Sequence, residues 1–313
     1  MERIPLADWV NALVLYLRVN FRTFFRGVSE QVTSFVDGIE AVLLGPFPLV
    51  FGVLVALATL AAARRSMRSA VGFGLFTALG LGLIHNLGLW GRTMDTLALV
   101  LAAGFVSLAI GLPLGVLMAR VGLARALLKP ALDFMQTMPA FVYLIPAIVF
   151  FNIGTASALF ATVVFASPAM IRLVAHGIEH VDKEVVEASE AFGATWWQTL
   201  WKVQVPLARP SILVGLNQTL MLSLSMVVIA AMIGAGGLGA VVLEGLATVN
   251  AGRGFEGGIS IVILAVVVDR ITQAFGAARK PGQGGILSTL RRMARAQMGS
   301  RHAEDVPLAL EKP

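Results

Sequence analysis

Residues 187–206 read EASEAFGATWWQTLWKVQVP and are the key to the predicted fold, because long apolar segments flank them on both sides. This stretch is the only sizeable polar insert of helix-compatible composition in a chain otherwise suited to lipid. A short helix held between two membrane spans can receive force from a soluble partner and pass it into the membrane. The arrangement predicts a transporter subunit that is driven from outside itself.

The composition excludes an ordinary soluble domain. Hydrophobic residues make up 57% of the 313 residues and charged residues only 13%, whereas soluble domains carry roughly 25% charged residues. The apolar residues fall in runs of about 20, the length that crosses about 30 Å of hydrocarbon. We therefore predict an all-α fold, a polytopic helical membrane protein.

Cysteine and charge exclude several kinds of site. The chain has no cysteine, so disulfides, thiolate metal sites and cysteine nucleophiles are excluded. The net charge of +6 does not indicate nucleic-acid binding, because the basic residues cluster at the ends of apolar runs. No cleavable signal peptide is expected, since Glu2, Asp8 and Arg18 interrupt the first residues.

About seven crossings are expected, and the basic gaps between them set the orientation. Arg64, Arg65 and Arg68 close the first gap, and Arg120, Arg125 and Lys129 close the third. Basic gaps face the cytoplasm, which places the N-terminus outside, the C-terminus inside and the insert at 177–209 in the cytoplasm. The expected spans lie near 42–63, 70–90, 95–119, 134–154, 157–176, 210–233 and 258–275.

The two ends of the chain differ from the spans. Residues 4–37 repeat apolar residues at helical spacing, with Arg18, Arg22 and Arg26 forming a basic stripe. This pattern favours a helix in the headgroup plane, or a basic face on a helix packed against the bundle. The basic tail at 276–313 is expected to be cytoplasmic and mobile, with a short surface helix near 286–298.

Within the insert, residues 181–202 predict one or two short amphipathic helices. Glu184, Glu187 and Glu190 recur near the start, where the helix dipole favours carboxylates. Gly193 permits a turn, and Pro206 and Pro210 are expected to stop the helix before the next span.

The same insert resembles the EAA loop of ABC-importer permeases. Glu187-Ala188-Ser189, Gly193, Val203 and Val205-Pro206 keep its spacing, with Ser189 in place of the second alanine and valines in place of Ile and Leu. Similar segments stand at 135–143, 217–222, 225–230 and 236–239. Together, over roughly residues 90–275, they resemble the permease subunit of glycine betaine/proline betaine (and choline) uptake systems.

That resemblance implies a mechanism and a set of partners. It implies a type I ABC-importer permease, in a bacterial inner membrane, for a quaternary ammonium compatible solute. Two permease copies, a cytoplasmic ATPase dimer and an extracytoplasmic solute-binding protein are implied as partners. Six residues are implied to form the ATPase-coupling loop, none of them catalytic: Glu187, Ala188, Ser189, Gly193, Val203 and Pro206.

No cofactor or metal is expected on this chain. It lacks a G-x-x-x-x-G-K-[ST] phosphate loop, so ATP hydrolysis is expected on another polypeptide. The expected organisation is an N-terminal interfacial helix at 1–41, two accessory spans at 42–90, the permease domain at 91–275 and the tail at 276–313.

Polar and aromatic residues within the spans are the candidates for lining the translocation pathway. Gln218 and Ser225 share one helix face with Asn217 beside it, whereas Thr219 and Ser223 lie on the other side. We expect one of these two helix faces to line the pathway and the other to join neighbouring helices. Small polar residues more often join helices than contact solute. Phe141 and Tyr143 are candidates for cation–π contact with an ammonium solute, against an ordinary packing role.

Two further motifs favour structural roles. Gly111 and Gly115 flank Pro113 in a G-x-x-x-G pair, which suits close helix approach or a kink. Asp269 and Arg270 lie near the cytoplasmic end of the last span, where pairing or snorkelling is expected over function.

Three patterns suggest other chemistry. Gly234 to Gly239 satisfies G-x-G-x-x-G but follows a span instead of a strand, so a flexible outer turn is expected. His176, Glu179 and His180 match H-x-x-E-H, which keeps an intramembrane zinc protease as an alternative. The glycosylation triplet at 217–219 lies inside a span. The other open alternatives are an ABC permease for another small solute, such as an amino acid, and an ion-driven transporter.

Overall fold

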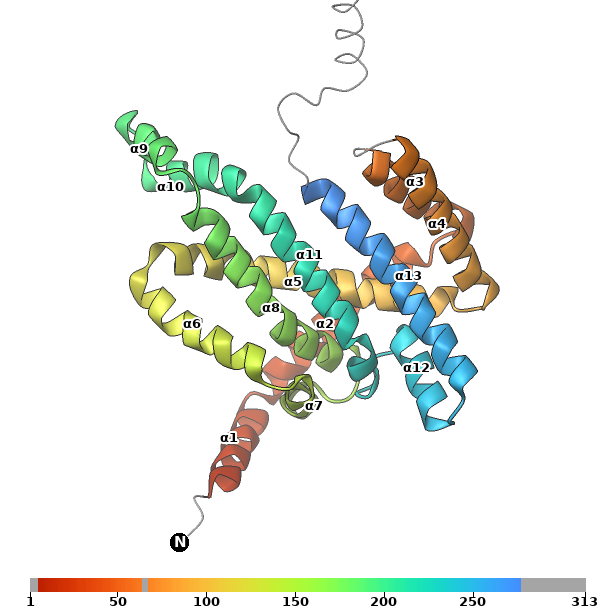
Figure 1. The fold of residues 1–313 in the computed structure, drawn as a ribbon. Coiled ribbons are helices and arrows are strands. Elements are labelled where there is room, and N and C mark those ends of the chain that lie inside the picture. The colour runs from red at the N-terminus through yellow and green to blue at the C-terminus, as the bar shows by residue number, and fades with distance from the viewer. Residues whose placement is uncertain (1–4, 64–66, 277–313) are drawn as a thin grey trace, which may run out of the picture. The chain divides into compact units, whose positions relative to one another are not determined.

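A computed structural model describes residues 5–63 and 67–276, and these residues form helices with no strand among them (Figure 1). The all-α prediction is confirmed. The helices, in chain order, are α1 Leu6–Asn20, α2 Arg22–Leu43, α3 Phe47–Ala63, α4 Met67–Asn86, α5 Trp90–Arg120, α6 Gly122–Thr137, η1 Ala140–Tyr143, α7 Leu144–Phe151, α8 Thr155–Glu179, α9 Lys183–Ala191, α10 Trp196–Thr199, η2 Leu200–Gln204, α11 Val205–Ala231, α12 Gly237–Ala247 and α13 Ala251–Gly276.

The number of spans agrees with the sequence-based expectation. In the described part of the chain, five helices are long and apolar enough to cross a membrane, and up to seven spans result if two bent helix pairs each count as one. The helices α4, α5, α8, α11 and α13 match the expected spans at 70–90, 95–119, 157–176, 210–233 and 258–275, within several residues at each end.

The span expected at 134–154 is wrong as a single helix. The helix α6 ends at Thr137, and the chain turns by 108° before it continues through η1 and α7. Met138 has an extended backbone (φ −70°, ψ 135°), because the ring of Pro139 disfavours helical geometry in the residue before it. The mean hydropathy of residues 134–154 does not reveal this local break in the helix.

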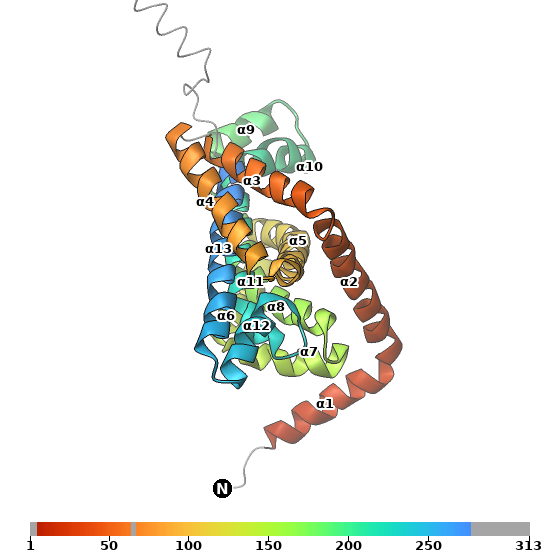
Figure 2. The ribbon, with the colours of Figure 1, turned by 90° about the vertical axis from the view of Figure 1, so that its right-hand side faces the viewer.

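The N-terminal segment is two helices that meet at Phe21, not one. The second, α2, packs against α5 and α8, and Figure 2 shows it along the side of the bundle. Val36 is buried in that contact, so this half of the segment has the packed arrangement and not a purely interfacial one. The expected span at 42–63 begins later, at Phe47, and α3 leaves α2 at 91°.

Three long helices, α5, α8 and α11, form the centre of the bundle. Glycine makes their close approach possible: a Cβ added at Gly111 would lie 2.5 Å from Met170 Cγ, and one at Gly115 would lie 2.6 Å from Val174 Cβ. The predicted close-approach role of the G-x-x-x-G pair is confirmed. Since lipid offers no hydrophobic drive between helices, backbone proximity of this kind stabilises the contact through van der Waals packing.

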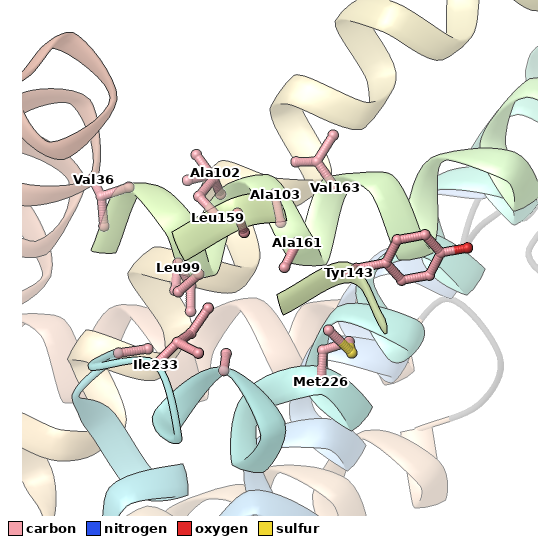
Figure 3. Close-up of a cluster of buried hydrophobic side chains, with 14 of the residues drawn as sticks. Val36, Leu99, Ala102, Ala103, Tyr143, Leu159, Ala161, Val163, Met226 and Ile233 are labelled. Atoms are coloured by element: carbon pink, nitrogen blue, oxygen red, sulfur yellow. The ribbon is translucent and has the colours of Figure 1, made fainter. Parts of the chain in front are cut away.

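An apolar cluster joins the centre of the bundle to α2, η1 and α7. Its members include Val36 from α2, Leu99 from α5, Leu159 from α8 and Met226 from α11, and Figure 3 shows their side chains converging. The sequence pattern does not predict this cluster, because its members come from elements far apart in the chain.

The glycines at 234–239 form a packed turn, not the flexible one expected. Gly234 and Gly237 have positive φ angles of 89° and 75°, which other residues rarely adopt. A Cβ at Gly237 would lie 2.4 Å from Thr96 Oγ1, and one at Gly239 would lie 2.3 Å from the carbonyl oxygen of Val227. The Leu238 N–H donates to Thr96 Oγ1 at 2.8 Å. The turn then leads into α12, a short apolar helix absent from the predicted spans.

The predicted basic tail begins at Gly276, the last residue of α13. The rest of it, including the surface helix expected near 286–298, lies outside the described residues.

Candidate coupling loop and transport pathway

The insert between α8 and α11 contains the short helices that the sequence predicts. The helix α9 begins after Asp182, whose side chain accepts a hydrogen bond from the Glu184 N–H at 3.0 Å. Such a cap satisfies a backbone donor that an isolated helix end leaves free. Figure 1 shows α9 and α10 together at one end of the bundle.

Gly193 terminates α9 in a left-handed conformation. Its φ is 81°, its N–H donates to the Glu190 carbonyl at 2.9 Å, and the Ala194 N–H donates to the Ser189 carbonyl at 3.1 Å. This pair of bonds is the Schellman motif, which places a glycine just after the helix end. Gly193 therefore sets the direction in which the chain leaves α9.

The second part of the insert is held by a capping box and a side-chain contact. The Thr195 side chain accepts from the Gln198 N–H, while the Gln198 side chain accepts from the Thr195 N–H. Ser189 Oγ lies 3.1 Å from Thr199 Oγ1, which joins α9 to α10. Ser189, which stands where the EAA loop that this insert resembles has its second alanine, thus joins the two helices.

Pro206 does not stop the helix, contrary to the sequence-based expectation. The region 196–231 forms one long apolar helix, with Pro206 in the first turn of α11 and Pro210 inside it. A proline in a helix leaves the carbonyl four residues earlier without its donor. The π-helical segment η2, which contains Val203, lies where Pro206 removes such a bond.

The surface of the insert is acidic and aromatic. Glu187 and Ala188 are exposed and Ser189 is half-buried. Phe192 is 93% exposed and Trp197 is 61% exposed, and Trp197 stacks parallel to Trp201 with ring centroids 6.4 Å apart. Large exposed apolar groups beside charged ones are typical of a protein interaction surface.

Arg120 connects the end of α5 to this insert. Its guanidinium donates a hydrogen bond to Gln204 Oε1 and lies 5.9 Å from the ring centroid of Trp196. Gln204 is only 5% exposed, so the arginine is the partner that satisfies a buried amide. The sequence indicates Arg120 only as a basic residue that marks the membrane orientation, because its hydrogen-bond partner is 84 residues away.

Of the predicted pathway residues, Asn217 lies between helices. Its amide nitrogen donates to Asp269 Oδ1 at 2.9 Å, and its amide oxygen accepts from the Thr272 hydroxyl. Gln273 also donates to Asp269, at 2.7 and 2.8 Å. Asp269 therefore has the structural role that we expected, and the contact joins α11 to α13.

The other polar and aromatic residues considered for the pathway do not share one environment. Gln218 and Ser225 are exposed on one face of α11, while Thr219 and Ser223 are buried and donate to carbonyls of their own helix. Phe141 is 54% exposed, whereas Tyr143 is 6% exposed and its hydroxyl donates to the Met135 carbonyl. The lining role of these residues stays a prediction.

Comparison with known proteins decides the family. The family described as binding-protein-dependent transport system inner membrane component matches residues 111–280, a segment that contains α8, α11 and the whole insert between them. This chain belongs to that family.

The permease has close relatives along nearly its full length. It is 45% identical to the glycine betaine/carnitine transport permease protein GbuB of Listeria monocytogenes, over 88% of this chain and 97% of the relative. It is 45% identical to the glycine betaine transport system permease protein OpuAB of Bacillus subtilis, over 90% and 97%. The glycine betaine/proline betaine permease ProW of Escherichia coli is 45% identical over 87% and 75%.

A solved structure supports the architecture of the permease. The inward-facing MetNI methionine ABC transporter matches with a TM-score of 0.53 and 29% identity, over 59% of this chain and 94% of that chain. The permease therefore has the fold of an ABC-importer membrane subunit and spans the membrane several times.

The histidine pattern of the permease has an ordinary structural explanation. Glu179 is paired with Arg125 at 2.5 Å, and His180 Nδ1 lies 2.9 Å from the His176 carbonyl oxygen. Within residues 5–63 and 67–276, no group of three or more His, Cys, Asp or Glu could hold a metal ion. Family membership favours a transport subunit over the zinc protease alternative.

Proposed function

We propose that this chain forms the translocation pathway of an ATP-driven importer for a quaternary ammonium compatible solute, such as glycine betaine, proline betaine or choline. The observation that carries the proposal is 45% identity to permeases named for glycine betaine over about nine-tenths of the chain. Glycine betaine, proline betaine and carnitine, which appear in the relatives' names, share a fully alkylated, positively charged nitrogen.

In this proposal the motor is a separate ATPase dimer that binds the insert. The exposed end of α9, with Glu187, Ala188 and Gly193, would seat in a groove on the ATPase, and Phe192 and Trp197 would add apolar contact area. Ser189, Val203 and Pro206 would keep α9, η2 and α11 in register. Closure of the ATPase dimer then shifts the population between inward-open and outward-open states.

The assembly contains two copies of this chain in a bacterial inner membrane, with a binding protein on the outer side. We place the N-terminus outside and the insert in the cytoplasm, since ATP is available there. Gln218 and Ser225, on the exposed face of α11, are the residues we assign to the pathway. Asn217 positions that face through its contacts with α13.

Reconstitution tests the proposal. The chain, an ATPase subunit and a binding protein from the same genome are placed in proteoliposomes, and uptake of radiolabelled glycine betaine is measured with and without ATP. We expect accumulation only with all three components and ATP. Uptake by the chain alone, or ATP hydrolysis by the purified chain, would contradict the proposal.

A second experiment addresses the coupling loop. Glu187→Ala and Glu187→Gln are compared with Glu244→Gln, an exposed carboxylate that pairs with Arg253 and lies in α12 at the other end of the bundle. The proposal predicts that both Glu187 variants take up less solute per ATP hydrolysed than the wild type. The Glu244→Gln control should have the same ratio of uptake to hydrolysis as the wild type. Unchanged uptake in all three would remove Glu187 from the docking surface.

An amino acid is the competing cargo, because a solved structure that matches this chain is a methionine transporter. Unlabelled choline, proline betaine and L-methionine are added in excess during betaine uptake. Competition by the ammonium compounds but not by methionine supports the proposed class, and the reverse result favours an amino acid permease.

A further inference from the structure

A cavity of about 550 Å³ lies between the junction of α1 and α2 and the end of α7. Figures 1 and 2 show α1 beside α7 at the end of the bundle away from α9 and α10. Arginines provide most of its charge, and the remaining wall is largely apolar. The lining includes Arg18, Arg22, Arg26, Glu30, Phe25 and Phe150.

The charge of the cavity is unbalanced. Arg26 pairs with Glu30 at 3.3 Å, and Glu30 is the only acidic residue of the lining among residues 5–63 and 67–276. Within the described residues no ion pair involves Arg18 or Arg22, although both line the same cavity. A guanidinium stays charged at all ordinary pH values, so the cavity offers two uncompensated cations to an anionic ligand.

The apolar side of the cavity continues into exposed surface. Phe25 stacks on Phe150 with ring centroids 4.7 Å apart, which closes one wall. Leu15 and Val19, also in the lining, are exposed on α1. A cationic pocket that opens onto exposed aliphatic side chains matches an amphiphile with a charged head and hydrocarbon chains.

The position along the bundle agrees with a membrane interface. Asn152, which lines the cavity, lies two residues before Gly154, whose N–H donates to the Ile233 carbonyl just after α11. This end of α11 is opposite to the end that carries the coupling insert. In the proposed orientation it faces the outer side, where the positive-inside rule disfavours arginine. A bound anion offsets that unfavourable placement.

We infer that this cavity binds the phosphate headgroup of an anionic phospholipid, with Arg18 and Arg22 donating to the phosphate and the acyl chains lying along Leu15 and Val19. Arginine suits this role, because its planar fork binds two phosphate oxygens at once. The bound lipid would hold α1 against α7. The inference needs only that the chain resides in a membrane, so it is independent of the proposed solute and of the ATPase.

Native mass spectrometry of the full chain in neutral detergent tests the inference. Short-chain phosphatidylglycerol, phosphatidylcholine of equal chain length and inorganic phosphate are titrated separately. The variants are Arg18→Gln/Arg22→Gln, the charge-preserving Arg18→Lys/Arg22→Lys, and a matched control, Lys129→Gln/Arg209→Gln, which removes two exposed basic residues elsewhere. Circular dichroism checks that each variant is folded.

We expect saturable binding of phosphatidylglycerol by the wild-type chain, weakened about 30-fold in the glutamine double variant, since each basic residue near an anionic lipid contributes about a factor of five. The lysine variant should bind more tightly than the glutamine variant, and the control should match the wild type. Three results would each overturn the inference. They are a loss of phosphatidylglycerol affinity in the control as large as in the glutamine variant, binding of phosphatidylcholine as tight as that of phosphatidylglycerol, and binding of inorganic phosphate without lipid.

Discussion

Residue 193 shows how a single backbone conformation determines the shape of the proposed coupling loop, the insert between α8 and α11. Gly193 has a φ of 81°, and no atom lies within 4 Å of the point that a Cβ would occupy, so conformation and not space requires glycine there. The two hydrogen bonds that close α9 depend on this conformation. The residue therefore acts on the direction of the chain and not through contacts of its own.

Replacing Gly193 tests this directly. Gly193→Ala should destabilise the loop by about 1 kcal/mol, the typical penalty for a left-handed residue with a Cβ, and Gly193→Val by more. Gly193→Asn should recover part of the loss, because asparagine tolerates this conformation. Hydrogen exchange of the α9 amides measures the effect. Gly122→Ala, at an uncrowded helical position, is the control and should leave α9 unchanged.

Arg120 is a positioning residue whose loss should affect coupling more than folding of the spans. Arg120→Ala leaves the buried Gln204 amide without its partner, which costs about 1–3 kcal/mol. We expect fewer solute molecules moved per ATP hydrolysed, together with a lower thermal midpoint. A double-mutant cycle with Gln204→Ala should show non-additive losses, since the two residues share one hydrogen bond.

The matched comparison for Arg120 is Arg125, which pairs with Glu179 at a partly exposed site. Exposed ion pairs contribute about 0–1 kcal/mol, so Arg125→Ala should change the thermal midpoint little. Equal effects of the two substitutions on the transport-to-hydrolysis ratio would contradict a specific role of Arg120.

At the scale of elements, the contact between α5 and α8 depends on two glycines one turn apart. A side chain at Gly115 would meet Val174 at 2.6 Å and the backbone oxygen of Ile171 at 2.8 Å. A backbone atom cannot move aside as a side chain can. The two helices would have to separate along their contact.

Gly115→Leu should therefore destabilise the fold by at least the 1–3 kcal/mol typical of overpacked cores. The loss of stability is measured as the midpoint of thermal unfolding in detergent, with size-exclusion chromatography as the readout of unfolding. Gly91→Leu is the control on the same helix, because nothing lies within 4 Å of a Cβ at that position. A Gly115→Leu chain as stable as the control would show that α5 and α8 are not in close contact.

At the scale of the whole molecule, the helices place the insert and the α12 turn at opposite ends of the bundle (Figure 1). The helix α5 joins both ends: Arg120 contacts the insert, and Thr96 accepts a hydrogen bond at the start of α12. In the proposed mechanism, α5 would carry a displacement of the insert to the far side of the membrane.

The orientation can be measured on a chain that has no natural cysteine. We expect Leu246→Cys, exposed on α12, to react with a membrane-impermeant maleimide in intact cells. Glu190→Cys, exposed on α9, should react only after the membrane is permeabilised. Labelling in the opposite pattern would invert the proposed topology and remove the ATPase from the insert.

The membrane class, most of the spans and the short helices of the insert could be predicted from the amino-acid sequence. These features are local: transfer of a span into lipid depends on its own side chains, and the caps at Asp182 and Gly193 act within a few residues. The break in the helix at Met138 could also have been predicted, because Pro139 disfavours helical geometry in the residue before it.

Contacts between residues far apart in the chain could not be predicted from the sequence. Asn217 has its partners 52 and 55 residues away, and Arg120 reaches Gln204 across 84 residues. No periodicity encodes such pairs, since they arise from how packed helices are placed against one another. The arginines of the α1–α2 junction likewise read as a stripe in the sequence, and only the position of α7 makes them the wall of a cavity.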